Sequence, residues 1–108
     1  MEKPKWEKGQ LLFGVYHGTN SYKFFEVVNY TKAGNPRVIE LKKSVIPGYS
    51  NPAYNSKKVN IENPRKYISK PIAIRWSDTA GYGITLAQTR YSLFEYDSNR
   101  EYLCESYY

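Results

Sequence analysis

Residues 22–30 (YKFFEVVNY) decide the fold class of this chain. The spacing of the apolar residues at 24, 25, 27 and 28 fits a short helix as well as a strand. The segment is, however, dominated by aromatic and β-branched residues, which pack well on a pleated surface. We therefore interpret it as a β-strand.

The segments on either side extend this interpretation to a three-stranded meander. Residues 10–16 (QLLFGVY) predict a strand before it, and residues 37–46 predict one after it. Lys32 to Pro36 (KAGNP) separates the second and third strands, because Gly and Asn tolerate positive φ and Pro ends a ladder. Short connections of this kind favour antiparallel neighbours.

Further strands are expected along the rest of the chain. Residues 59–62 predict a short strand, residues 71–76 a strand, and residues 84–96 a long strand that turns near Gln88. Residues 63–70 (NPRKYISK) fit either one turn of helix or an irregular edge. Residues 78–83 (DTAGYG) predict a turn.

The chain end predicts a hairpin, with residues 91–96 paired to residues 101–108 around a turn at residues 97–100. That register places Phe94 opposite Leu103. About six strands in one layer would leave open edges, so we expect a mainly-β fold. It would be a small, strongly coiled antiparallel sheet or an SH3-like or OB-like barrel, with at most one short helix. Residues 1–8 are expected to form a flexible N-terminus and residues 9–108 a single β-rich domain.

The expected core consists of apolar residues on the inward faces of these strands. They are Phe24 or Phe25, Val27, Ile39, Leu41, Ile72, Ile74, Trp76, Leu93 and Leu103.

The composition is that of a globular protein of one domain. Its 108 residues are 41% hydrophobic and 24% charged. A single cysteine cannot form an internal disulfide, so nothing in the sequence suggests an oxidising compartment, and no apolar stretch reaches the length of a membrane span. We expect a cytoplasmic protein, in the host cell if a phage encodes it.

The sequence contains few residues that could carry out catalysis or bind a metal. His17 is the only histidine and lies in a Gly-flanked turn, and Cys104 is the only cysteine and lies among aromatic residues. One of each cannot supply the ligands of a zinc site. The sequence predicts a protein that is not an enzyme and that uses no metal or cofactor.

A basic stretch is the strongest candidate for a binding site. The net charge is +6, and residues 91–108 hold four of the ten acidic residues. Cations interleaved with aromatic rings suit the binding of single-stranded nucleic acid. The alternative interpretation is that these lysines form a solvated face that only keeps the protein soluble. The candidate residues are Lys57, Lys58, Arg65, Lys66, Lys70 and Arg75 with Tyr49, Tyr54 and Tyr67.

Two parts of the chain resemble small accessory proteins of phages and mobile elements. These are the succession GQLLFGVY, Thr19-Asn20 and KFFEVVNY, and the tyrosine-rich end from Tyr91 to Tyr108. The resemblance implies a protein that inhibits a host system by stoichiometric binding, as anti-CRISPR proteins do. Its partner would be a host protein or a nucleoprotein defence complex.

Two other functions stay open at this point. One is a free-standing domain that binds RNA or single-stranded DNA through the basic stretch. The other is a sponge for a nucleotide signal, which requires a closed pocket in an oligomer.

Overall fold

A computed structural model describes residues 2–16, 21–46 and 57–104, which form ten strands and no helix. The strands are β1 (Leu11–Tyr16), β2 (Ser21–Tyr30), β3 (Pro36–Leu41), β4 (Lys43–Val45), β5 (Lys57–Ile61), β6 (Ile72–Ala73), β7 (Arg75–Ser77), β8 (Gly81–Leu86), β9 (Thr89–Glu95) and β10 (Tyr102–Cys104). The mainly-β prediction is confirmed.

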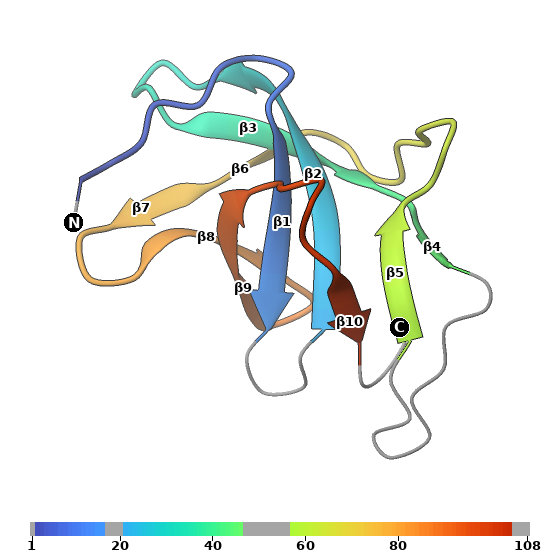
Figure 1. Cartoon of the computed structure of the whole chain (residues 1–108). Coiled ribbons are helices and arrows are strands. Elements are labelled where there is room, and N and C mark those ends of the chain that lie inside the picture. The colour runs from blue at the N-terminus through green and yellow to red at the C-terminus, as the bar shows by residue number, and fades with distance from the viewer. Residues whose placement is uncertain (1, 17–20, 47–56, 105–108) are drawn as a thin grey trace.

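Seven strands form one antiparallel sheet in the order β6-β3-β2-β1-β9-β8-β7. The two outermost strands, β6 and β7, are consecutive in the chain and are separated only by Ile74. This sheet therefore curls until its edges nearly meet, as Figure 1 shows. With β6 and β7 taken as one bent strand, the barrel has the expected number of about six strands. The predicted meander of the first three strands is confirmed.

The remaining strands form a small sheet in the order β10-β5-β4, which lies beside β1 and β2 (Figure 1). Residues 37–46, expected as one strand, divide at Lys42 into β3 of the barrel and β4 of this second sheet. Residues 63–70 take the irregular form, with a single bridge between Leu41 and Tyr67.

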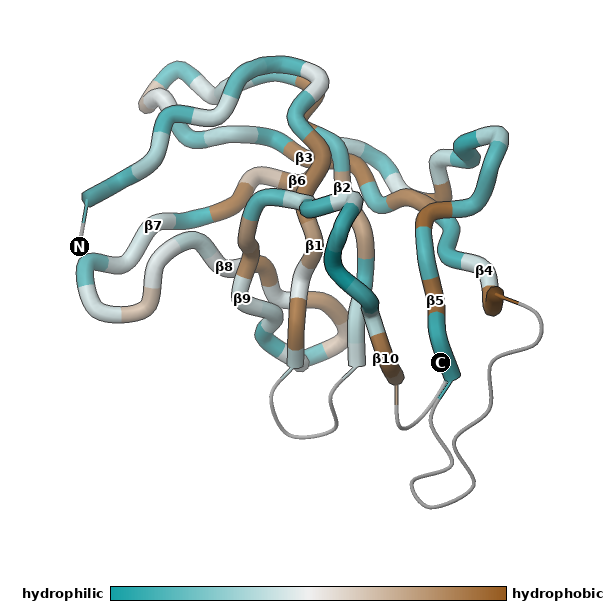
Figure 2. The backbone as a smooth tube through the Cα atoms, in the orientation of Figure 1, coloured by the Kyte–Doolittle hydropathy of each residue, from teal (hydrophilic) through white to brown (hydrophobic). Residues whose placement is uncertain are grey.

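Two hydrophobic clusters hold these layers together. The inner cluster fills the barrel and consists of Trp6, Leu12, Phe25, Val27, Val38, Ile74, Tyr82, Ile84, Tyr91 and Leu93. The outer cluster lies between the barrel and the second sheet and consists of Phe13, Val15, Phe24, Leu41, Val59, Tyr102 and Cys104. Strands β1 and β2 contribute to both clusters, so they are hydrophobic on both faces (Figure 2).

The predicted C-terminal hairpin is wrong. The turn at Asp97 exists, since its carbonyl accepts a bond from Arg100 N at 3.1 Å. However, β9 already pairs with β1 on one side and β8 on the other. Because no edge of β9 is free, β10 crosses to the second sheet and pairs with β5, which places Leu103 opposite Lys58.

The predicted core is confirmed in part. Phe24, Phe25, Val27, Leu41, Ile74 and Leu93 are all buried. Ile39 and Leu103 are only half-buried, while their neighbours Val38, Tyr102 and Cys104 take the buried positions. Successive side chains of a strand point to opposite faces, so burial of Tyr102 and Cys104 in the outer cluster leaves Leu103 between them on the other face.

The long segment at residues 84–96 is two strands joined by a tight turn. Leu86 and Thr89 pair across Ala87 and Gln88, whose φ angles are 48° and 69°. Two positive φ angles define a type I′ hairpin turn, which suits the twist of the strands but strains residues with a β-carbon. The expected change of direction near Gln88 is therefore a complete hairpin.

The N-terminal segment is anchored at Trp6, which is 4% exposed. Its indole Nε1 donates to Glu95 at 3.1 Å, and its ring lies 4.4 Å from that of Tyr82. The Tyr82 hydroxyl donates to the Pro4 carbonyl at 3.2 Å. The charged composition of residues 1–8 gave no sign of this anchor.

Truncation of Ile74 tests the barrel closure. Ile74 is 1% exposed, so Ile74→Ala leaves a cavity and should lower the free energy of unfolding by about 2–5 kcal/mol. The matched change Ile68→Ala, at a side chain 53% exposed, should change it by about 0.5 kcal/mol or less. Urea denaturation measures both. Equal values for the two variants would contradict the position of Ile74 in the inner cluster.

Relief of the strained turn should stabilise the protein. Asn-Gly is the preferred pair of a type I′ turn, so Ala87→Asn with Gln88→Gly should raise the free energy of unfolding by about 1 kcal/mol. Lys32→Gly, in a turn where φ is not positive, should lower it slightly. Thermal and urea unfolding provide the measurement, and a destabilised Asn-Gly variant would contradict the turn type.

Candidate functional site

Residues 62–71 form an irregular segment that is tied along β3 by its backbone. Lys42 N donates to the Lys66 carbonyl and Ile68 N to the Glu40 carbonyl, each at 2.9 Å. Glu40 N in turn donates to Ser69 Oγ at 2.9 Å. These bonds fix the path of the segment, so the positions of its side chains are defined although it is not a strand.

Two large side chains of this segment face solvent. Tyr67 is 54% exposed and Ile68 is 53% exposed, the highest values among the large hydrophobic residues in the described part of the chain. Burial of such side chains in an interface removes apolar area from water, and tyrosine is enriched at the energetically important positions of interfaces. A fixed backbone also lowers the entropy that binding costs.

The cations around Tyr67 are partly neutralised by acids. Arg65 Nη1 donates to Glu26 Oε1 at 2.8 Å, and the Tyr67 hydroxyl donates to the same oxygen at 3.3 Å. Lys66 and Lys42 lie 3.4 and 3.5 Å from the two oxygens of Glu62. Arg65, Lys66 and Lys42 are thus held in ion pairs, whereas Lys70 of the same segment forms none with a described acid.

Glu62 remains ionised between its two lysines. Desolvation raises the pKa of this carboxyl group, but the hydrogen bond from Lys66 and the positive charges of Lys42 and Lys66 lower it more. The pKa therefore lies below its ordinary value. Glu62 remains a counter-charge at any pH near neutrality.

The structure separates the predicted basic residues into three groups. Arg65, Lys66, Tyr67 and Lys70 come together on residues 62–71, with Lys70 exposed. Lys57 and Lys58 lie on β5, where Lys58 forms an ion pair of 3.3 Å with Glu101. Tyr49 and Tyr54 lie outside the described residues.

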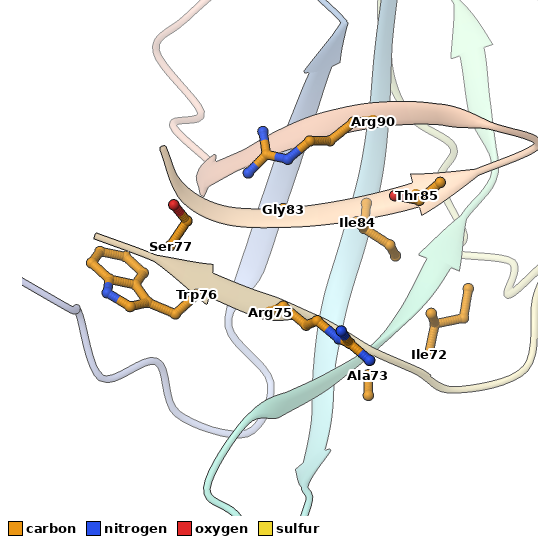
Figure 3. Close-up of a pocket in the computed structure, with 9 residues that line it drawn as sticks. All are labelled: Ile72, Ala73, Arg75, Trp76, Ser77, Gly83, Ile84, Thr85 and Arg90. Carbon is orange, nitrogen blue, oxygen red and sulfur yellow. The ribbon is translucent and has the colours of Figure 1, made fainter. Parts of the chain in front are cut away.

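Arg75 lies apart from all of these residues, on β7. It lines a hollow that Arg90 of β9 also lines, as Figure 3 shows. Sequence reasoning missed Arg90 because it stands fifteen positions after Arg75 and outside the basic stretch. It also missed Ile68, for which the only signal was an apolar residue beside Tyr67 in a segment without a regular pattern.

The described residues contain neither a candidate metal-binding group nor an exposed thiol. No three His, Cys, Asp or Glu side chains among residues 2–16, 21–46 and 57–104 form a group that could hold a metal ion. Cys104 is buried in the outer cluster, in agreement with a packing role. His17 lies outside the described residues. None of the described segments is a helix long and apolar enough to cross a bilayer.

Comparison with known proteins gives no relative. No family model, no curated protein and no solved structure matches the chain.

The ion pairs on residues 62–71 should limit attraction to polyanions. Glu26→Gln with Glu62→Gln frees Arg65, Lys42 and Lys66, so this variant should elute from a heparin column at higher salt than the wild type. The matched variant Glu2→Gln with Glu7→Gln removes two exposed acids at the N-terminal end of the chain, outside residues 62–71. It should show a smaller shift, although the change in net charge is the same. Identical elution of both variants would show that the pairs do not restrain the cations.

Proposed function

We propose that this chain is a non-enzymatic binding protein that recognises a protein surface through Tyr67 and Ile68. The observation that carries the proposal is the exposure of these two side chains on a backbone fixed by hydrogen bonds to Glu40 and Lys42. An exposed apolar pair on a mobile loop would be ordinary, whereas a tethered pair is already arranged for contact.

The charges favour a protein over a nucleic acid as the partner of this surface. A polyanion on this surface would lie close to the carboxylates of Glu26 and Glu62, and their repulsion reduces the gain from phosphate contacts. A protein partner with a few acidic groups could instead join these pairs at the rim of an interface around Tyr67. The partner we propose therefore has a mildly acidic surface with an apolar centre.

The resemblance to phage accessory proteins extends the proposal. In that setting the partner is a protein of a host defence complex, and stoichiometric binding inhibits it, in the manner of an anti-CRISPR protein. The protein acts in the cytoplasm of the host cell under this proposal.

A capture experiment tests the surface. The protein is immobilised, exposed to bacterial lysate with and without nuclease, and the bound proteins are quantified by mass spectrometry. We expect a partner that survives nuclease treatment and is lost at least tenfold with Tyr67→Ser and Ile68→Ser.

The matched control is Tyr30→Ser with Val45→Ser, which removes another exposed aromatic and another exposed aliphatic side chain. This control should retain the partner, and both variants should melt close to the wild-type temperature. Capture that nuclease abolishes, or equal loss in the two variants, would overturn the proposal.

A second candidate function is the binding of RNA or single-stranded DNA. It is favoured by Lys57, Lys70 and Arg75, which form no ion pair with any described acid. Capture that depends on nucleic acid would support it. The nucleotide sponge stays a prediction from the sequence.

A further inference from the structure

The outer face of strands β7, β8 and β9 is the part of the barrel that the second sheet leaves uncovered. Directly opposed residues of an antiparallel pair share one face. Arg75 is opposite Gly83, and Gly83 is opposite Ser92. Arg90 is opposite Thr85. These residues therefore all lie on the same face, while Tyr82, Ile84 and Tyr91 between them belong to the inner cluster.

A hollow of about 430 Å³ lies on this face. Arg75, Ser77, Thr85 and Arg90 line it, and none of its nine lining residues is acidic. Its volume falls within the range of about 300–1,000 Å³ that small-molecule sites occupy. Figure 3 shows the Arg90 guanidinium above Gly83 of β8, while the Arg75 side chain runs along β7 toward Ala73.

Arg90 is held in position before any ligand binds. Its Nη1 donates to Ser92 Oγ at 3.0 Å. Its guanidinium occupies the space that a side chain at residue 83 would need, because a β-carbon there would lie 2.5 Å from Arg90 Cζ. Glycine at position 83 thus allows the guanidinium to lie against the backbone of β8.

The two arginines lack the counter-charges that Arg65 and Lys66 have. Neither forms an ion pair with an acid in the described part of the chain, whereas Arg65 is paired with Glu26 at 2.8 Å. Arg90 lies above Gly83, the residue directly opposite Arg75, so the two side chains reach the hollow from the strands on either side of β8. Since none of the lining residues is acidic, the two arginines give the hollow a positive charge that favours an anion.

We propose that this hollow is a phosphate-binding site of the protein. Arg90 and Arg75 donate to the phosphate oxygens, for which the planar guanidinium fork is well suited. The hydroxyl groups of Ser77 and Thr85 add neutral donors at the wall. The phosphate belongs to a nucleotide, either free or within a single strand. The site is separate from Tyr67 and Ile68, so it does not depend on the protein-binding proposal.

Titration calorimetry with adenosine monophosphate and with a ten-residue oligothymidylate tests the site. Binding of the mononucleotide assigns the site to free nucleotides, and binding of the oligonucleotide alone assigns it to a strand. Arg75→Gln and Arg90→Gln should each lower the affinity for whichever ligand the wild-type protein binds at least tenfold. Failure of both ligands to bind the wild-type protein would overturn the proposal.

Gly83→Ala is the sharpest variant, because it displaces the Arg90 guanidinium and leaves every charge in place. It should weaken binding about as much as Arg90→Gln. If Gly83→Ala melts well below the wild type, Arg90→Lys replaces it as the test. This variant also keeps the positive charge and removes the planar guanidinium that would bind two phosphate oxygens. The controls are Lys8→Gln and Lys32→Gln, which each remove one exposed positive charge elsewhere and should change binding less than twofold. Equal losses in the controls and the arginine variants, or full binding in the charge-preserving variant, would contradict a built site.

Discussion

Burial of Ile74 is the constraint on which the barrel depends. The chain leaves one edge of the sheet at β6 and joins the opposite edge at β7 with this single residue between them. Strands β6 and β7 have only two and three residues, so their ladder bonds alone hold the edges weakly. Ile74 N donates to the Pro36 carbonyl at 3.0 Å, and its side chain is buried in the inner cluster. The closure thus combines one backbone bond with apolar burial, and it removes the edges that an open sheet would expose.

Closure also determines which parts of the outer surface are covered. The second sheet needs an apolar surface to pack on, and Phe13, Val15 and Phe24 of β1 and β2 provide it. The outer face of β7 to β9 carries arginine, serine and threonine instead, and it stays open. The side chains of β1, β2 and β7 to β9 therefore decide which outer face the second sheet covers and which face stays open to solvent.

The sequence predicted what depends on neighbours along the chain. The meander of β1 to β3 followed from alternating apolar residues and from the KAGNP turn, both of which are local. The hairpin of β9 with β10 was wrong because it too was inferred locally, while β1 competes for the same edge of β9 from 80 positions away. Val38 and Tyr102 were missed for a related reason, since the buried face of a strand depends on partners that the pattern does not name.

The sequence also does not show which basic residues of the candidate sites are paired with acids that lie far away in the chain. Arg65 and Arg75 look equivalent in the sequence, because each lies in a basic stretch near a tyrosine or a tryptophan. Glu26, 39 positions before Arg65, turns that arginine into half of an ion pair. Near Arg75, the nearest carboxylate along the chain is that of Asp78, which accepts a bond from the Trp76 indole at 2.9 Å.

The one acid of β9 lies on the opposite face from Arg90. Glu95 points to the inner side of the barrel and accepts the indole bond of Trp6. Neither carboxylate forms an ion pair with Arg75 or Arg90. Placement of the acids, rather than the density of cations, separates a surface suited to an apolar protein contact from a hollow suited to an anion. A count of basic residues alone would instead choose residues 62–71, rather than the hollow lined by Arg75 and Arg90, as the anion-binding surface.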